Sequence, residues 1–192
     1  MGFIRDYLPP YKRTVIIAIT SIMTALVCAV TYSFPILVNA LTGGYFNIGE
    51  IVIFIAAILF GPFVGGFAGG VGAALADAIV APQFVIGTLP IKFLEGFVVG
   101  YIIYTAKLKN WLIDWNTWKE RGLIIAAVVI GGIIMVMGYF FFELYIWSIG
   151  DALAEIPVNI AQLFVGLGVA VPVSIQINNA LYLEPSPSKE IN

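Results

Sequence analysis

The chain alternates between long apolar stretches and short segments that contain glycine, proline and polar residues. Several of the apolar stretches reach the roughly 20 residues that an α-helix needs to cross the hydrocarbon core of a bilayer. Pro35 and the pair Gly61-Pro62 mark ends of such stretches. The pattern predicts six membrane-spanning helices, at about 14–34, 48–60, 62–80, 88–106, 122–147 and 155–177.

The expected fold class is therefore an all-α integral membrane protein with six transmembrane helices. We divide the chain into an N-terminal segment, 1–13, one six-helix membrane domain, 14–178, and a tail, 179–192. Lysine and arginine lie before the first span, between the fourth and fifth spans and after the sixth, whereas the loops after spans one, three and five contain neither. By the positive-inside rule this bias predicts that both termini are cytoplasmic and that the protein lies in the cell (cytoplasmic) membrane.

The segment between the fourth and fifth spans has its own pattern. Trp111, Trp115 and Trp118 follow one another at i, i+4 and i+7, with charged residues between them. This spacing predicts an amphipathic helix that lies in the cytoplasmic interface. Such a helix is either an aromatic anchor or a docking surface for a partner.

The composition excludes several classes of protein. Hydrophobic residues make up 61% of the chain and charged residues only 10%, against about 25% charged residues in a soluble domain. The absence of histidine excludes imidazole metal sites and nucleophiles activated by histidine. Cys28 is the only cysteine, so no disulfide forms within one chain. No basic tract indicates nucleic acid, and we expect a lipid bilayer as the surroundings.

The few charged residues are the candidate chemistry. When the spans are threaded through a bilayer, six ionisable residues fall toward the outer side: Glu50, Asp77, Lys92, Glu95, Glu143 and Glu155. A charged side chain near the centre of a membrane helix costs roughly 2.5–3.5 kcal/mol, so a group of them on one side indicates a site. Glu50, Asp77 and Asp151 lie close to predicted span ends, which favours interfacial charges; an ion pair of Lys92 with Glu95 or Glu143 is the other alternative to ligand binding.

The last span carries a polar stripe. Glu155, Asn159, Gln162 and Gly166 share one helical face, which indicates a face that lines a cavity and not one that contacts lipid. Tyr139 lies one turn before Glu143 on the fifth span and could stack on a planar ligand ring. Lys92 together with these carboxylates and amides suggests a ligand that carries both hydrogen-bond donors and acceptors.

Small residues recur at helical spacing in two spans. The third span carries one ladder at Gly65, Gly69 and Ala73 and a second on the neighbouring face, which predicts close packing within this protein. The first span carries Ser21, Ala25 and Ala29. For this ladder, internal packing and contact with another membrane subunit remain alternatives.

Four motifs, in order and spacing, resemble a known family. They are Gly44-Tyr-Phe-Asn-Ile-Gly-Glu50, Ala57-Ile-Leu-Phe-Gly-Pro62, Gly69-Gly-Val-Gly-Ala-Ala-Leu-Ala-Asp77 and Thr88-Leu-Pro-Ile-Lys-Phe-Leu-Glu-Gly96. The chain resembles the substrate-binding S components of energy-coupling factor (ECF) transporters, and among them the riboflavin type. The resemblance implies a six-helix bundle that captures a vitamin on its outer side. It also implies a transmembrane coupling subunit and two ATPase subunits as partners.

The resemblance extends to particular segments of this chain. It implies that Ala25 and Ala29 dock on the coupling subunit and that residues 37–47 form a lid over the pocket. ATP would be hydrolysed by the partner subunits, so we expect no cofactor in this chain and no enzymatic activity. The expected substrate is riboflavin, a pyrimidine precursor of thiamine or another small heterocycle.

The sequence analysis thus ends on two sets of residues. The expected substrate-binding residues are Asn47, Lys92, Glu95, Tyr139, Glu143, Asn159 and Gln162, and the expected partner-docking residues are Ser21, Ala25 and Ala29. The alternative is a stand-alone, dimeric secondary transporter in which Glu95, Glu143 or Asp77 carries a proton or cation. An intramembrane hydrolase is disfavoured, since no Asp/Glu pair has the setting of an aspartyl protease.

Overall fold

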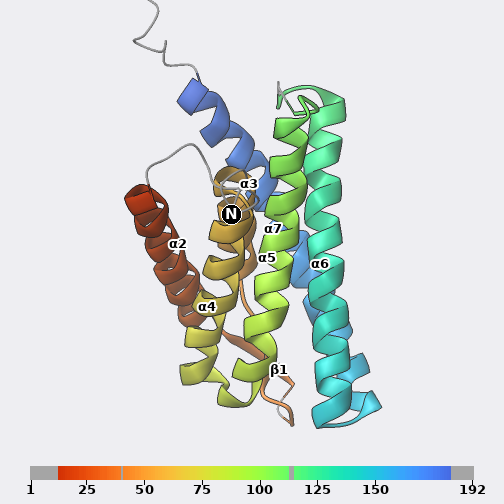
Figure 1. The fold of residues 1–192 in the computed structure, drawn as a ribbon. Helices are drawn as coiled ribbons and strands as arrows, with labels where there is room; N and C mark the ends of the chain where they lie inside the picture. The colour runs from red at the N-terminus through yellow and green to blue at the C-terminus, as the bar shows by residue number, and fades with distance from the viewer. Residues whose placement is uncertain (1–12, 40, 113–114, 183–192) are drawn as a thin grey trace, which may run out of the picture.

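The computed structural model of the chain describes residues 13–39, 41–112 and 115–182. In chain order its elements are α2 (Arg13–Ser33), β1 (Ile36–Asn39), β2 (Gly44–Phe46), α3 (Gly49–Phe60), α4 (Pro62–Val80), the 3-10 helix η1 (Pro82–Phe84), α5 (Val85–Leu108), α6 (Trp118–Ile146) and α7 (Ile149–Tyr182), as Figure 1 shows. Residues 1–12 of the predicted N-terminal segment and residues 183–192 of the predicted tail lie outside the described residues.

The expected all-helical membrane fold is found. Among the described residues, five helices are long and apolar enough to cross a membrane, and α3, with 12 residues, is shorter. The outer loop predicted after the first span is an antiparallel hairpin instead, in which Ile36 pairs with Phe46 and Leu37 with Tyr45. The bounds of α2, α3 and α4 lie within one residue of the predicted spans, whereas α5, α6 and α7 begin three to six residues before them.

Local sequence explains where the helices begin. Gly61 separates α3 from α4 with a φ of 89°, a conformation that glycine adopts without strain, and Pro62 occupies the first turn of α4. The Thr117 side chain caps α6 by accepting a hydrogen bond from the Glu120 N–H at 3.4 Å, and Ser148 does the same for Asp151 at 3.2 Å. These caps make α6 and α7 begin four and six residues before the predicted spans, at 118 and 149.

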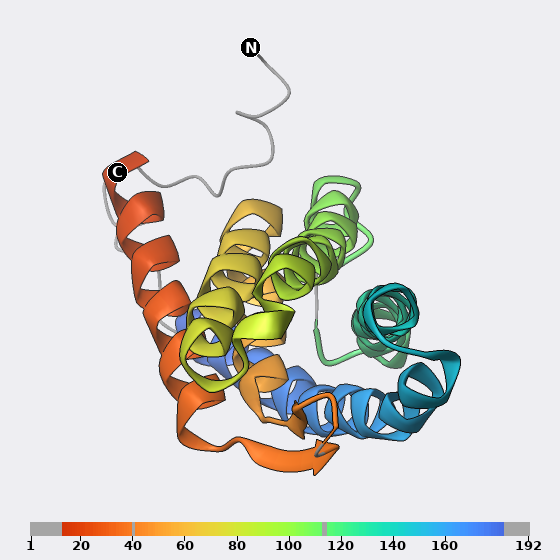
Figure 2. The same cartoon turned by 90° about the horizontal axis from the view of Figure 1, so that it is seen from below.

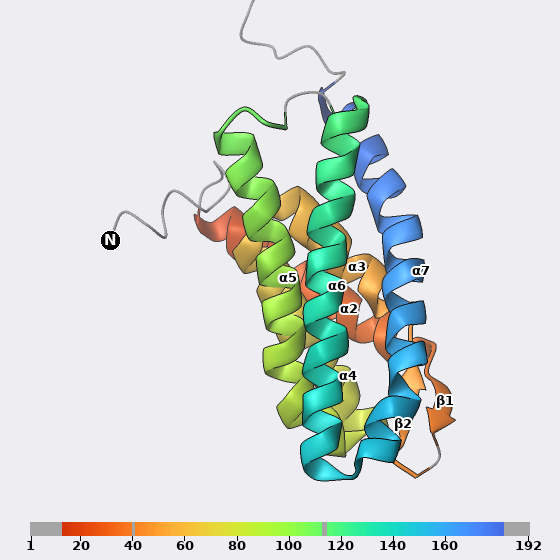
Figure 3. The same cartoon turned by 90° about the vertical axis from the view of Figure 1, so that its right-hand side faces the viewer.

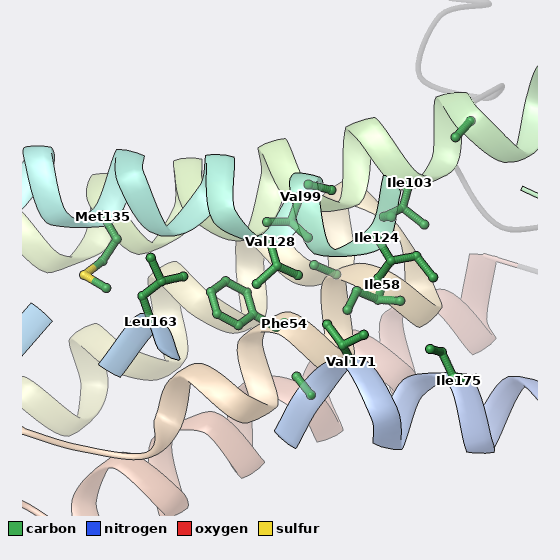
Figure 4. Close-up of a cluster of buried hydrophobic side chains, with 14 of the residues drawn as sticks. Phe54, Ile58, Val99, Ile103, Ile124, Val128, Met135, Leu163, Val171 and Ile175 are labelled. Atoms are coloured by element: carbon green, nitrogen blue, oxygen red, sulfur yellow. The ribbon is translucent and has the colours of Figure 1, made fainter. Parts of the chain in front are cut away.

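The helices form a bundle around α3. The short helix α3 contacts α2, α4, α5 and α7, whereas α6 packs between α5 and α7. Figure 2, which looks along the bundle, shows α2 at one side and α6 at the other. Buried side chains of α3, α5, α6 and α7 meet in the main hydrophobic cluster, labelled in Figure 4, and a second cluster joins α2, α3 and α4.

The glycine ladders of α4 bring this helix against α5. A Cβ atom on Gly69 would lie 2.6 Å from the carbonyl oxygen of Lys92, and one on Gly70 would lie 2.7 Å from that of Leu89. Real Cβ atoms do not approach this closely, so only glycine permits the contact. The predicted packing of the third span within this protein is therefore confirmed.

The predicted amphipathic helix between α5 and α6 is wrong. The described residues of this segment form turns, and α6 begins only at Trp118. Trp115 is 3% exposed and belongs to the main hydrophobic cluster, with the Lys107 ammonium 4.6 Å from its ring centroid. Burial of one tryptophan anchors the segment to the bundle, so the three tryptophans do not share a surface.

The hairpin lies at one end of the bundle, as Figures 1 and 3 show. The connection from α4 through η1 to α5 and the connection from α6 to α7 lie at the same end. These are the segments that contain no lysine or arginine. The candidate site is built at this end.

Candidate functional site

A pocket lies at the hairpin end of the bundle. The space between its lining residues, counted out to the solvent at its open mouth, is about 350 Å³. Residues from the hairpin, η1, the segment before α3 and four helices line it: Gly44, Tyr45, Asn47, Asp77, Phe84, Thr88, Lys92, Tyr139, Glu143, Glu155, Asn159 and Gln162. Polar groups from every side thus converge on one cavity.

Lys92 of α5 is the only basic residue among those lining residues. Its ammonium is paired with the carboxylate of Glu50, from α3, and lies 3.3 Å from that of Glu95, one turn further along α5. It also lies 5.4 Å from the ring centroid of Tyr139. All of these groups are buried, so the positive charge of Lys92 is held by carboxylates that do not themselves line the pocket.

Asp77, near the end of α4, accepts two hydrogen bonds. One comes from the hydroxyl of Tyr45 on β2, and the other comes from the hydroxyl of Thr88 on α5 at 2.5 Å. Burial, and then the charge of Asp77, raise the pKa of the Tyr45 hydroxyl, so this group remains a donor. The Thr88 hydroxyl also lies 3.0 Å from that of Tyr139. The Asp77 carboxylate therefore connects the hairpin to three helices.

The polar stripe of α7 reaches the same pocket. The Gln162 side-chain oxygen accepts hydrogen bonds from the backbone N–H of Asn47 at 3.1 Å and from its side chain at 2.8 Å. The Gln162 amide in turn donates to Asn159 at 3.0 Å. Glu155, one turn before Asn159, accepts a hydrogen bond from the hydroxyl of Thr42 at 2.8 Å. The last member of the stripe, Gly166, packs against Phe54 and Glu50 of α3.

The hairpin is tied to the bundle on both sides. Thr42 lies between the strands and, besides its bond to Glu155, accepts a hydrogen bond from Gln83 of η1 at its carbonyl oxygen, at 2.9 Å. Gly44 lies against the Glu155 carboxylate, with no room for a side chain. Hydrogen bonds thus join the hairpin to α4, η1 and α7, and the hairpin forms one wall of the pocket.

Most of the predicted substrate-binding residues come together here. Asn47, Lys92, Tyr139, Glu143, Asn159 and Gln162 all line the pocket, whereas Glu95 is completely buried behind Lys92. Glu50 and Asp77 lie near the ends of predicted spans, which favoured interfacial charges. In the structure both residues are buried, with exposed fractions of 1% and 3%. The partner-docking candidates Ser21, Ala25 and Ala29 lie elsewhere, on the exposed face of α2, while Met23 and Val27 face the bundle.

Some lining residues were not singled out from the sequence. Thr88 carried a usable signal, because it is a polar residue at the start of an apolar span, one turn before Lys92. Tyr45 and Phe84 carried none, since aromatic residues are common in segments at the membrane surface. No group of three or more His, Cys, Asp or Glu side chains among the described residues could hold a metal ion.

Comparison with known proteins gives the family. The family described as the ECF-type riboflavin transporter S component matches residues 12–179. The chain is also 43% identical over 124 residues to an uncharacterized protein of Pyrococcus woesei, an alignment that covers 65% of this chain and 76% of that protein. S components are substrate-binding subunits of vitamin transporters and not enzymes. The chain belongs to the S component family of ECF-type riboflavin transporters and is a multi-pass membrane protein.

Proposed function

We propose that this S component captures a small heterocyclic micronutrient, riboflavin or a related compound, in the pocket beneath the hairpin. The observation that carries the proposal is the convergence of amide, hydroxyl and carboxylate groups from the hairpin, α4, α5, α6 and α7 on one cavity. Planar heterocycles carry donors and acceptors at their edges, which such a lining can match. Phe84 and Tyr139, with ring centroids 6.4 Å apart, add aromatic surface.

The hairpin is the proposed lid. Because Thr42, Tyr45 and Asn47 bond to groups of the bundle, release of these few hydrogen bonds would open the pocket without disturbing a helix. The same end of the bundle is the outer side in our proposed topology, with six spans, both termini cytoplasmic and the protein in the cytoplasmic membrane. Absence of lysine and arginine from the three connections at this end supports that orientation.

Transport would require partners. We propose that a transmembrane coupling subunit and two ATPase subunits supply ATP hydrolysis and that this chain itself uses no cofactor. The exposed face of α2, with Ser21, Ala25 and Ala29, is the proposed docking surface, since small side chains let another helix approach closely. The opposite face of α2 is already occupied by α3 and α4.

Two measurements test this function. Mass spectrometry of the purified full chain should find a small heterocycle bound in about equal molar amount, and isothermal titration should give its affinity. Tagged protein expressed with its natural partners should co-purify with ATPase subunits, and uptake should require them. Uptake driven by an ion gradient in liposomes that contain this chain alone would overturn the proposal in favour of a secondary transporter.

A further inference from the structure

The pocket has an unbalanced set of charges. Three carboxylates, those of Asp77, Glu143 and Glu155, line it together with the single ammonium of Lys92. The charge of Lys92 is already paired with Glu50 and Glu95, which lie behind the lining. The ammonium of Lys92 is therefore already paired when the pocket is empty. The carboxylates that line the pocket have no cation of their own among the described residues.

The three carboxylates differ in the hydrogen bonds that they accept. Asp77 accepts hydrogen bonds from two hydroxyls, and Glu155 accepts one from Thr42. Glu143, on α6, is 2% exposed, and its Oε2 atom has no hydrogen-bond partner in the described part of the chain. A buried carboxylate oxygen without a donor is costly, and natural structures rarely leave one unless a ligand, ion or water completes it. Because Glu143 lines the pocket, a donor on a bound ligand can reach this atom.

An anionic ligand does not fit this lining. A phosphate group would meet three carboxylates in a site of low dielectric, where repulsion between like charges is strong. Lys92 offers little compensation, because its ammonium is engaged by Glu50 and Glu95. A neutral ligand could donate to Glu143 but would bring no counter-charge to Glu143 and Glu155, which both line the pocket.

We infer that the ligand of this pocket carries a positively charged nitrogen, as a protonated amine or a cationic ring nitrogen, that lies against Glu143 with Glu155 beside it. This inference rests on the proposed function and narrows its substrate class. The cation would donate to the unpaired Oε2 atom of Glu143 and offset one of the two negative charges. The rings of Phe84 and Tyr139, which also line the pocket, favour a cation attached to or near a planar heterocycle. Riboflavin, whose ring system is neutral, would lack this contact.

The test combines ligand identification with matched probes. The ligand that co-purifies with the full chain is identified by mass spectrometry, and affinities are measured by titration for riboflavin, its anionic monophosphate, cationic thiamine, and two pyrimidines that differ only in an aminomethyl or a hydroxymethyl group. We expect the native ligand and the best-bound probe to carry a cationic nitrogen. We expect the aminomethyl pyrimidine to bind more tightly than its hydroxymethyl counterpart.

Substitution of the carboxylates then assigns the contact. Glu143→Gln should weaken binding of the cationic ligand by about tenfold or more, since a hydrogen bond to a charged group is lost, and Glu155→Gln should weaken it less. Glu120→Gln, in the first turn of α6 and outside the lining, is the matched control and should leave the affinity unchanged. Unaltered thermal unfolding of each variant shows that the fold is retained.

The outcomes separate this inference from the proposed function. A neutral or anionic native ligand, or Glu143→Gln protein that binds its ligand as tightly as the unmodified chain, would overturn the inference and leave the vitamin-capturing role standing. Failure to find any co-purified ligand, together with no binding of any probe, would overturn the proposed function and the inference with it.

Discussion

Lys92 is held between carboxylates from two helices, Glu50 of α3 and Glu95 of its own helix. In a buried setting, the attraction of an ion pair offsets only part of the cost of removing its charges from water. Loss of one partner is much more costly than loss of the pair, because an uncompensated charge remains. Lys92 is therefore important for stability as well as for the wall of the pocket.

Lys92→Met should lower the free energy of unfolding by about 3–5 kcal/mol, because Glu50 and Glu95 lose their cation. The double variant with Glu50→Gln should recover part of this loss. Thermal unfolding in detergent measures both, with Lys119→Met on the exposed start of α6 as the control. Lys92→Met protein that unfolds at the unmodified temperature would show that the pair adds nothing.

Replacement of Asn159 or Gln162 by Leu should weaken ligand binding by about 1–3 kcal/mol, since each removes buried hydrogen-bonding groups from the pocket. Gln162→Leu should have the larger effect, because it also frees Asn47. Titration of the native ligand measures the change. Gln176→Leu, an exposed glutamine on the same helix, is the matched control. Equal affinities for all three variants would mean that the polar stripe does not contact the ligand.

At the scale of elements, the contact between α4 and α5 positions half of the pocket. Asp77 is on one of these helices, and Thr88 and Lys92 are on the other. Glycines let the two backbones approach until side chains on both helices reach the same cavity. The distance between the helices is thus a condition for the site.

Gly69→Ala should destabilise the protein by about 1–3 kcal/mol, because the added methyl group would lie 2.6 Å from a backbone oxygen that has little freedom to move. Gly168→Ala in α7 is the control. No atom outside its own helix lies within 4 Å of the added methyl, so this change should stabilise the helix by roughly 0.5–1 kcal/mol. Equal unfolding temperatures for the two variants would contradict the close contact.

The hairpin is a separate element whose attachment can be weakened without changing a helix. Thr42→Val keeps the shape of the side chain but removes two hydrogen bonds: the one donated to Glu155, a bond to a charged group worth about 1.5–3 kcal/mol, and the one accepted from the Gly44 N–H within the hairpin. We expect faster hydrogen exchange in residues 41–46 and faster release of ligand. Thr14→Val on exposed α2 should change neither rate. Unchanged exchange in the Thr42 variant would mean that these bonds do not hold the hairpin in place.

At the scale of the whole molecule, the pocket and the proposed docking surface lie on different parts of the bundle. The ligand site is built from the hairpin, α4, α5, α6 and α7, whereas the exposed small residues belong to α2. Ligand binding and assembly with a coupling subunit should therefore be separable by mutation.

Ala25→Phe together with Ala29→Phe should abolish transport while leaving ligand affinity unchanged, because bulky side chains prevent close approach of a partner helix. Uptake by cells and titration of the purified chain give the two readouts. Ala126→Phe, on the exposed face of α6, should affect neither. A loss of affinity in the α2 variant would instead place these alanines in the internal packing of the bundle.

Much of this protein was determined by its sequence alone. Hydrophobic stretches of sufficient length specify membrane helices, and Gly61-Pro62 specifies the boundary between α3 and α4 to within a residue. Helical periodicity also placed Glu155, Asn159 and Gln162 on one face, because the 3.6-residue repeat depends only on local geometry. The caps at Thr117 and Ser148 had a local signal as well, but hydropathy does not register single polar residues at helix ends.

Other features were decided only by the tertiary structure. Lys92 pairs with a residue 42 positions away, Tyr45 with one 32 positions away, and Trp115 is buried although its spacing favoured an interfacial helix. Periodicity tells which face of a helix a side chain occupies, but not which face of which neighbour it meets. Which side chains meet depends on how closely the helices pack and how each is rotated about its axis. In this protein the glycines of α4 set its close contact with α5, and the hairpin connects α4 to α7. Consequently the sequence identified the carboxylates, and the fold decided which of them Lys92 neutralises and which oxygen, Oε2 of Glu143, has no hydrogen-bond partner among the described residues.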